Sequence, residues 1–230
     1  TQTIQSPGVV LARAAETGAW VESPHLVYAD EVSSLSLGTQ DDHDVIAVRE
    51  RGSADEPSAV RVVWAQGTRR EEVRLVTGRD PYTHVVLAPS AHSVELAWIY
   101  HDVVASEMVL RFASVNRYGP RVTPRDLLRR GFASALTTVP IAGGHLLAWS
   151  DIIHRESMAH ALVVSDLGEV QRGPWRVDDS RAFAATLRLA QSDGGYGVVW
   201  VDGRDGGARV YFARLDAKGE RVGAAVPVSD

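Results

Sequence analysis

The sequence contains no cysteine among its 230 residues. This absence excludes disulfide bonds, thiolate metal sites and cysteine nucleophiles. It does not fix the compartment, because a chain of this length can bury a core without cross-links in a secreted protein as well as in a cytosolic one.

Long apolar runs are also absent. No stretch approaches the roughly 20 apolar residues of a membrane-spanning helix, and the first residues, TQTIQSPG, lack the basic and apolar regions of a signal peptide. The sequence therefore predicts no membrane span. For an exported protein, it predicts a targeting segment upstream of Thr1.

Positive charge is scarce and dispersed. Lysine and arginine total 24 against 29 acidic residues, which gives a net charge of -5, and Lys218 is the single lysine. The longest basic runs are the pairs Arg69-Arg70 and Arg129-Arg130. Because phosphate binding needs a concentrated basic face, nucleic acid is excluded as a predicted partner.

Local catalytic motifs are missing as well. The sequence has no G-x-S-x-G elbow, no H-E-x-x-H pair, no P-loop and no EF-hand loop. His154 and His160 lie six residues apart, a spacing that suits neither a helical metal pair nor the alternation of a strand. We therefore predict no cofactor and no metal ion.

What the chain does contain is a period. Gly18, Gly67, Gly119, Gly168 and Gly219 follow one another at spacings of 49, 52, 49 and 51 residues, each between short apolar runs. A repeat of roughly 40 to 50 residues, built from short strands and turn residues, is typical of a β-propeller. The glycines are predicted to occupy turns that need positive φ.

Each repeat is predicted to form one blade of four strands. The last unit shows four runs rich in Val, Tyr, Phe and Thr, and a tryptophan marks the second run in three units, at Trp98, Trp149 and Trp200. We expect these rings to pack in the core. Gly18 lies in a segment that aligns with only a third and a fourth strand. The fold prediction is an all-β propeller of four complete blades plus an N-terminal half blade, about 18 strands in all.

The predicted single domain divides into a half blade over residues 1–32 and blades over residues 33–81, 82–134, 135–182 and 183–230. The half blade lacks two inner strands. Either the chain is an excerpt of a longer polypeptide, or another copy or another chain completes the ring, because open sheet edges attract strands. The segment TPRDLLRRGFAS, residues 123–134, is predicted to form a helical turn between two blades.

The last unit resembles the degenerate propeller repeats of exported bacterial proteins. The likeness is carried by Trp200, Asp202, Arg204 and Asp205, by the run Val210 to Asp216, and by the tail Gly219 to Asp230. This resemblance implies the propeller fold and an extracellular, cell-surface or periplasmic location. It implies no activity.

The turns between second and third strands share one face of a propeller, where ligands usually bind. We call this the loop face. The candidate site residues on it are Arg49, Arg51, Tyr100, His101, Asp102, Asp151, His154, Asp202, Arg204 and Asp205. Ordinary turn chemistry also explains Asp, Gly and Arg at these positions.

Because catalytic motifs are missing from a fold that presents loops on a rigid ring, we predict a non-catalytic binding or scaffolding propeller that contacts a protein or a glycan. The alternative is a carbohydrate-active hydrolase or lyase. That reaction needs two carboxyl groups about 5 to 10 Å apart, and Asp102, Asp151 and Asp202 are the candidates. A third hypothesis is that the chain is an assembly subunit, which forms a homo-oligomer or a ring that another chain completes.

Overall fold

The computed structural model describes residues 9–11, 25–28, 35–50, 57–77, 85–130, 133–153, 156–178, 185–204 and 206–229. These residues form strands and their connecting turns. No helix in the described ranges is long and apolar enough to cross a membrane.

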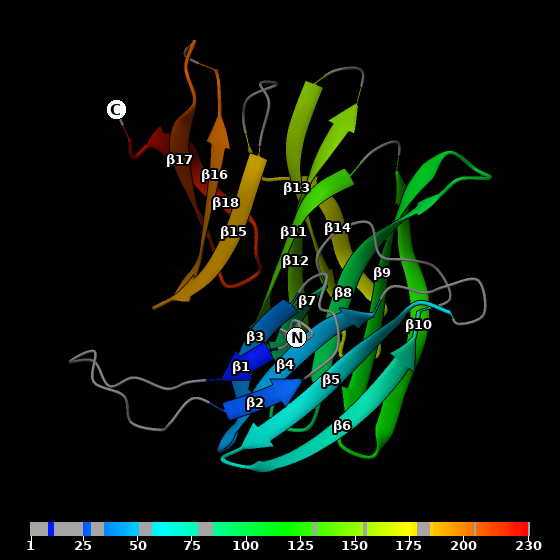
Figure 1. Cartoon of the computed structure of the whole chain (residues 1–230). Coiled ribbons are helices and arrows are strands. Elements are labelled where there is room, and N and C mark those ends of the chain that lie inside the picture. The colour runs from blue at the N-terminus through cyan, green and yellow to red at the C-terminus, as the bar shows by residue number, and fades with distance from the viewer. Residues whose placement is uncertain are drawn as a thin grey trace, which may run out of the picture.

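Four sheets of four strands each account for most of the fold (Figure 1). Blade 1 consists of β3 (Leu35–Gln40), β4 (His43–Glu50), β5 (Ala59–Gln66) and β6 (Arg69–Val76). Blade 2 consists of β7 (Val86–Pro89), β8 (Val94–Asp102), β9 (Glu107–Asn116) and β10 (Gly119–Arg130). Blade 3 consists of β11 (Ala133–Ile141), β12 (Gly144–Ile153), β13 (Glu156–Val164) and β14 (Val170–Arg176). Blade 4 consists of β15 (Ala185–Ser192), β16 (Gly195–Asp202), β17 (Arg209–Leu215) and β18 (Arg221–Pro227).

The remaining two strands form a separate antiparallel sheet. β1 (Val9–Leu11) pairs with β2 (His25–Tyr28). Together with the four blades they make 18 strands in the described residues, so the predicted all-β propeller of four blades and a half blade is confirmed. Gly18, on which the half blade was recognised, lies outside the described residues.

In every blade the strands follow chain order as an antiparallel meander. The first strands lie innermost, because β3 contacts β7, β7 contacts β11, and β11 contacts β15. Figure 1 shows the blades fanning outward from these strands. Each blade is therefore made of consecutive hairpins, and neighbouring blades contact one another through their first strands.

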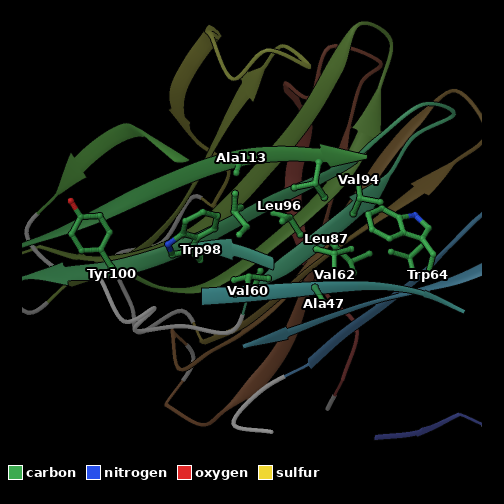
Figure 2. Packing of buried hydrophobic residues seen from close by; sticks show 14 of the residues in the cluster. Ala47, Val60, Val62, Trp64, Leu87, Val94, Leu96, Trp98, Tyr100 and Ala113 are labelled. Carbon is green, nitrogen blue, oxygen red and sulfur yellow. The ribbon is translucent and has the colours of Figure 1, made fainter. Parts of the chain in front are cut away.

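Three apolar layers hold neighbouring blades together. Blades 1 and 2 share a layer that contains Trp64, Leu96 and Trp98 (Figure 2). Blades 2 and 3 share a second layer around Ile99 and Trp149. A third layer, between blades 3 and 4, includes Val177, Leu187 and Trp200. Because side chains alternate along a strand, β8 and β12 each contribute to two layers, one on each face.

The tryptophans predicted to lie in the core do so. Trp98, Trp149 and Trp200 are each at most 1% exposed, and each belongs to the layer shared with the preceding blade. Core packing rather than ligand stacking therefore explains the tryptophan period.

The turn prediction for the glycines is also confirmed where the structure describes them. Gly67, Gly119, Gly168 and Gly219 join the third and fourth strands of the four blades, with φ values of 56°, 138°, 72° and 81°. Side chains rarely adopt this region because the Cβ atom then crowds the backbone. The period is thus a series of tight turns.

The helical turn predicted for residues 123–134 is wrong. Residues up to Arg130 belong to β10, whose pairing with β9 shifts register three times. One shift lies between Asp126 and Leu128, and it lets the adjacent Leu127 and Leu128 both pack against the layer between blades 2 and 3. Adjacent apolar residues that imitate a helical pattern here mark a β-bulge.

Candidate functional site

The loop-face residues lie near one equivalent position on the second strand of each blade, which we call the marker. The marker is a tryptophan in blades 2 to 4 and Val48 in blade 1, and it pairs with a residue on the third strand: Val48 with Arg61, Trp98 with Arg111, Trp149 with His160, and Trp200 with Tyr211. Side chains that pair directly point to the same face of their sheet. The marker and its partner therefore lie together beneath the loop face.

Two residues beyond each marker, the same face carries a second row of equivalent positions. These positions hold Glu50, Tyr100, Asp151 and Asp202. Asp102 lies two residues beyond Tyr100 along β8. Three blades thus present a carboxyl group at the equivalent position, and blade 2 presents a phenol with its aspartate displaced toward the turn.

In blade 4, Asp202 is 2% exposed and is held by two neighbours. It accepts a hydrogen bond from Trp200 Nε1 at 2.9 Å, one from the Arg204 backbone N–H at 3.1 Å and one from Arg204 Nε at 2.9 Å. The Arg204 guanidinium lies 4.0 Å from the centre of the Tyr211 ring. Burial opposes the charge of Asp202, but the hydrogen bonds from Arg204 and Trp200 outweigh it and hold the pKa of Asp202 below its usual range.

In blade 2, Asp102 closes the turn that follows β8. Its Oδ1 accepts hydrogen bonds from the Val104 and Ala105 backbone N–H groups, and its Oδ2 accepts one from Arg129 Nη1 at 3.2 Å. These bonds are those of an aspartate that shapes a turn. Asp102 and Asp202 are therefore both engaged by their own turns.

Tyr100 belongs to a charged cluster beside that turn. Its hydroxyl donates to Asp126 Oδ2 at 3.3 Å, and Arg111 lies 4.5 Å from the centre of its ring. Arg111 Nη1 also donates to the Thr77 carbonyl of blade 1 at 2.9 Å. Burial raises the pKa of Tyr100. The cluster ties blade 2 to the end of blade 1.

In blade 3, Asp151 has no exposed side-chain surface, and its Oδ2 lies 4.0 Å from His160 Nδ1. The His160 ring stacks on Trp149 with 5.9 Å between centres and 22° between planes. A buried carboxyl group and a largely buried imidazole therefore lie close together, and these residue types serve as acids and bases in proton transfer.

Asp178 lies close to this group. Val177 N donates to the Ala159 carbonyl at 2.9 Å, which places Asp178 beside Met158, and Met158 pairs with Asp151 on the other side. Arg176 Nε donates to Asp178 Oδ1 at 2.7 Å. Burial raises the pKa of Asp178, and the hydrogen bond from Arg176 offsets this effect only in part.

The other predicted site residues stand apart from these groups or fall outside the structure. Arg51, His154 and Asp205 lie outside the described residues. Arg49 is half-buried and pairs with Val60, so it lies on the opposite face of its sheet from Glu50. His101 is exposed and lies on the opposite face of its strand from Tyr100.

Sequence reasoning did not identify Asp178, Arg111 or Asp126 as site residues. They reach the loop face from third and fourth strands, or just after them, through cross-strand pairing. One signal was available: the marker partner follows its marker by 13 residues in blades 1 and 2 and by 11 residues in blades 3 and 4. A search for polar residues 11 or 13 positions after each marker would have identified Arg111 and His160.

A pocket of about 400 Å³ lies at the opposite end of the blades. Its lining includes His43 at the start of β4, Gln66 and Arg69 at the β5–β6 turn, and Arg117 at the β9–β10 turn. Arg117 Nη2 lies 3.2 Å from His43 Nδ1. This pocket is therefore formed by the first-to-second and third-to-fourth turns, and the loop-face carboxyl groups do not reach it.

Comparison with known proteins places the chain among solved structures by its fold. No family model matches the sequence, and the search of curated proteins found no match. A thermostable family-43 glycoside hydrolase is 11% identical over 86% of this chain and 72% of its own, with a TM-score of 0.55. The endo-arabinase of Bacteroides thetaiotaomicron is 7% identical over 94% of this chain and 88% of its own, with a TM-score of 0.54.

A third structure is an engineered family-43 glycoside hydrolase with both endo-xylanase and exo-arabinofuranosidase activity. It is 12% identical over 98% of this chain and 50% of its own, with a TM-score of 0.54. At such identities the likeness shows the fold alone. Because these neighbours are hydrolases, they contradict the prediction of a non-catalytic binding or scaffolding propeller.

Proposed function

We propose that this chain is the propeller of a glycoside hydrolase that acts on arabinan or xylan. The observation that carries the proposal is the match of 86% to 98% of the chain to two family-43 glycoside hydrolase structures and an endo-arabinase structure at TM-scores of 0.54 to 0.55. The carboxyl groups at the ends of the second strands support it, because glycosidic bonds are cleaved between two carboxyl groups.

The reaction needs one carboxyl group that keeps its proton and a second that is ionised. Asp178 suits the first role, since burial raises its pKa. Asp151 suits the second role because the two aspartates flank Met158. They lie two strand spacings apart, about 10 Å between backbones, which is on the order of the separation that glycoside hydrolases use. Asp102 and Asp202 are less suited, because turn N–H groups and arginines engage them.

In this scheme Asp178 donates its proton to the leaving glycosidic oxygen. Asp151 takes a proton from the water whose oxygen bonds to the anomeric carbon, so that one glycosidic bond is exchanged for one C–O bond to water. His160 Nδ1 lies 4.0 Å from Asp151 Oδ2, so it is placed to receive that proton from the carboxyl group.

The test is turnover on a panel of arabinan, xylan and unrelated polysaccharides, measured as released reducing ends. We expect activity on one of the two pentose polymers and a loss of roughly 10²- to 10⁴-fold in kcat for Asp151→Asn and for Asp178→Asn. Asp193→Asn is the matched control, since Asp193 is exposed in the β15–β16 turn at the opposite end. Thermal unfolding verifies that each variant is folded. Absence of turnover across the panel, or full activity in both folded variants, overturns the proposal.

We also propose that the protein is exported and that its blades belong to the degenerate repeats of exported bacterial proteins. The support is the resemblance of the last unit, and an extracellular glycan substrate agrees with it. Detection of the native protein in the medium or the cell envelope tests this location, and detection in the cytosol alone contradicts it. The predicted protein or glycan partner and the completion of the ring stay predictions.

A further inference from the structure

A cluster of three potential metal ligands lies between blades 2 and 3, away from the loop face. Glu95 near the start of β8, His145 near the start of β12 and Asp166 in the β13–β14 turn bring their ligand atoms within 4.8 Å of one another. Asp151 lies at the far end of the same strand β12. The cluster is therefore separate from the carboxyl groups proposed for hydrolysis.

Strand alternation explains why these side chains meet. Glu95 shares a strand face with Ala97 and Ile99, and His145 shares one with Leu147 and Trp149. Those four neighbours belong to the layer that joins blades 2 and 3. Glu95 and His145 thus face each other across the end of that layer, and they are only 2% and 1% exposed.

The polar atoms in this cluster lack sufficient hydrogen-bond partners. Within the described residues, Glu95 Oε2 and both ring nitrogens of His145 make no hydrogen bond. His145 Nε2 lies 3.4 Å from Glu95 Oε2 and 3.2 Å from Asp166 Oδ1. A neutral ring has one N–H at most, so a single proton on Nε2 cannot serve both carboxylates. A buried carboxylate oxygen left without a partner is costly.

The remaining contacts of Glu95 aim this oxygen toward His145. Its other oxygen, Oε1, accepts hydrogen bonds from Ser93 Oγ at 2.5 Å and from Ser114 Oγ at 3.1 Å. Arg121 Nη1 in turn donates to Ser93 Oγ at 2.7 Å. Such outer contacts are how proteins orient the carboxylates that bind metal ions.

We propose that Glu95, His145 and Asp166 form a Zn²⁺ site that joins blade 2 to blade 3. Zinc bonds of about 2.1 Å place adjacent ligand atoms roughly 3.0 to 3.4 Å apart. The two measured separations from His145 Nε2, 3.2 and 3.4 Å, match that spacing. One imidazole and two carboxylates suit Zn²⁺ better than Ca²⁺, which prefers about six to eight oxygens.

The types of ligand and the access to them agree with a divalent cation. Two carboxyl groups and one imidazole offer the oxygen and nitrogen atoms that Zn²⁺ binds. The Asp166 side chain is 51% exposed, so it provides the entry path and can adjust its position when the ion binds.

The test uses the full chain without a polyhistidine tag, stripped with chelator and titrated with Zn²⁺ by calorimetry. We expect one Zn²⁺ per chain and a rise in the thermal unfolding midpoint, with little effect of Ca²⁺ or Mg²⁺. His145→Gln should abolish binding. Asp166→Asn, in a half-exposed turn, should keep the fold and weaken binding by roughly 10- to 100-fold or more.

His101→Gln is the matched control, because His101 is exposed at the far end of β8. It should bind Zn²⁺ like the unmodified chain. Absence of stoichiometric binding, or binding by both Asp166→Asn and His145→Gln as tight as that of the unmodified chain, overturns the proposal. Because binding is measured without a polysaccharide, its failure is distinct from failure of the hydrolase proposal.

Discussion

Asp178 and Asp202 occupy similar places at blade ends and yet have pKa values shifted in opposite directions. Burial raises the pKa of Asp178, and the hydrogen bonds from Arg176 and the Ala159 backbone offset it only in part. Asp202 is also buried, but Arg204 and Trp200 together lower its pKa. The balance between burial and the hydrogen bonds and charges around each carboxyl group decides the direction.

This difference predicts opposite pH dependence for two asparagine variants. Asp178 binds its proton more tightly in the folded chain than in the unfolded chain, so its contribution to stability falls as the pH rises from about 3.8 through the raised pKa. Asp178→Asn removes that loss. The free energy of unfolding of this variant, relative to that of the unmodified chain, should therefore increase between about pH 3 and pH 7.

Asp202 contributes stability above its unfolded pKa, and this contribution is lost as the pH falls through its lowered folded value. Asp202→Asn should therefore cost about 1 to 3 kcal/mol near neutral pH and progressively less in acid. Urea unfolding at a series of pH values measures both variants. If the stability of the two variants changed with pH in the same direction, the opposite pKa shifts of Asp178 and Asp202 would be contradicted.

At the scale of elements, the third-to-fourth turns differ in how much space surrounds their glycines. Gly67 and Gly168 both have positive φ, at 56° and 72°. A Cβ atom on Gly67 would meet nothing within 4 Å, whereas one on Gly168 would lie 2.7 Å from Phe112 Cδ1. The same turn is thus open in blade 1 and packed against a neighbouring blade in blade 3.

Alanine substitution should separate these two effects. Gly67→Ala should cost about 1 to 2 kcal/mol for the left-handed backbone alone. Gly168→Ala should cost that amount plus on the order of 1 to 3 kcal/mol for displacing Phe112 from its layer. Chemical denaturation gives both values. Equal costs would mean that Phe112 moves away without loss.

The strands could be predicted from the sequence because the turn residues that separate them are recognisable locally. Gly67, Gly119, Gly168 and Gly219 each stand in a tight turn, and Trp98, Trp149 and Trp200 recur every 51 residues on the second strands of successive blades. The one false element, the helical turn over residues 123–134, arose because a β-bulge places Leu127 beside Leu128 on one side. Local spacing cannot distinguish a bulge from a helical turn.

The site was harder to predict, since it depends on contacts across strands and blades. Asp102 and Asp202 were predicted because turn residues can be recognised in a sequence. In the structure, backbone N–H groups of their own turns donate hydrogen bonds to both carboxyl groups. Asp178 approaches Asp151 only through the pairing of β13 with its neighbours. Glu95 and His145 are 50 residues apart and meet only across the layer between two blades.

At the scale of the whole molecule, the apolar layers couple each blade to the next. Blade 2 contributes to the layers with blades 1 and 3, and blade 3 contributes to those with blades 2 and 4. Unfolding of one blade would therefore expose the apolar face of its neighbour. In a repeat architecture this coupling decides whether the chain unfolds as one unit.

Leu187→Ala tests the coupling at the layer between blades 3 and 4. Leu187 is fully buried there on the innermost strand β15, so the variant should lose about 2 to 5 kcal/mol. We expect tryptophan fluorescence and far-ultraviolet circular dichroism to report one shared transition, because Trp64 in blade 1 and Trp200 in blade 4 belong to linked layers. Leu167→Ala, at a turn position 56% exposed, should change stability by less than about 0.5 kcal/mol. Separate transitions for the two probes in Leu187→Ala would show that blade 4 unfolds independently and that the layers do not transmit stability around the propeller.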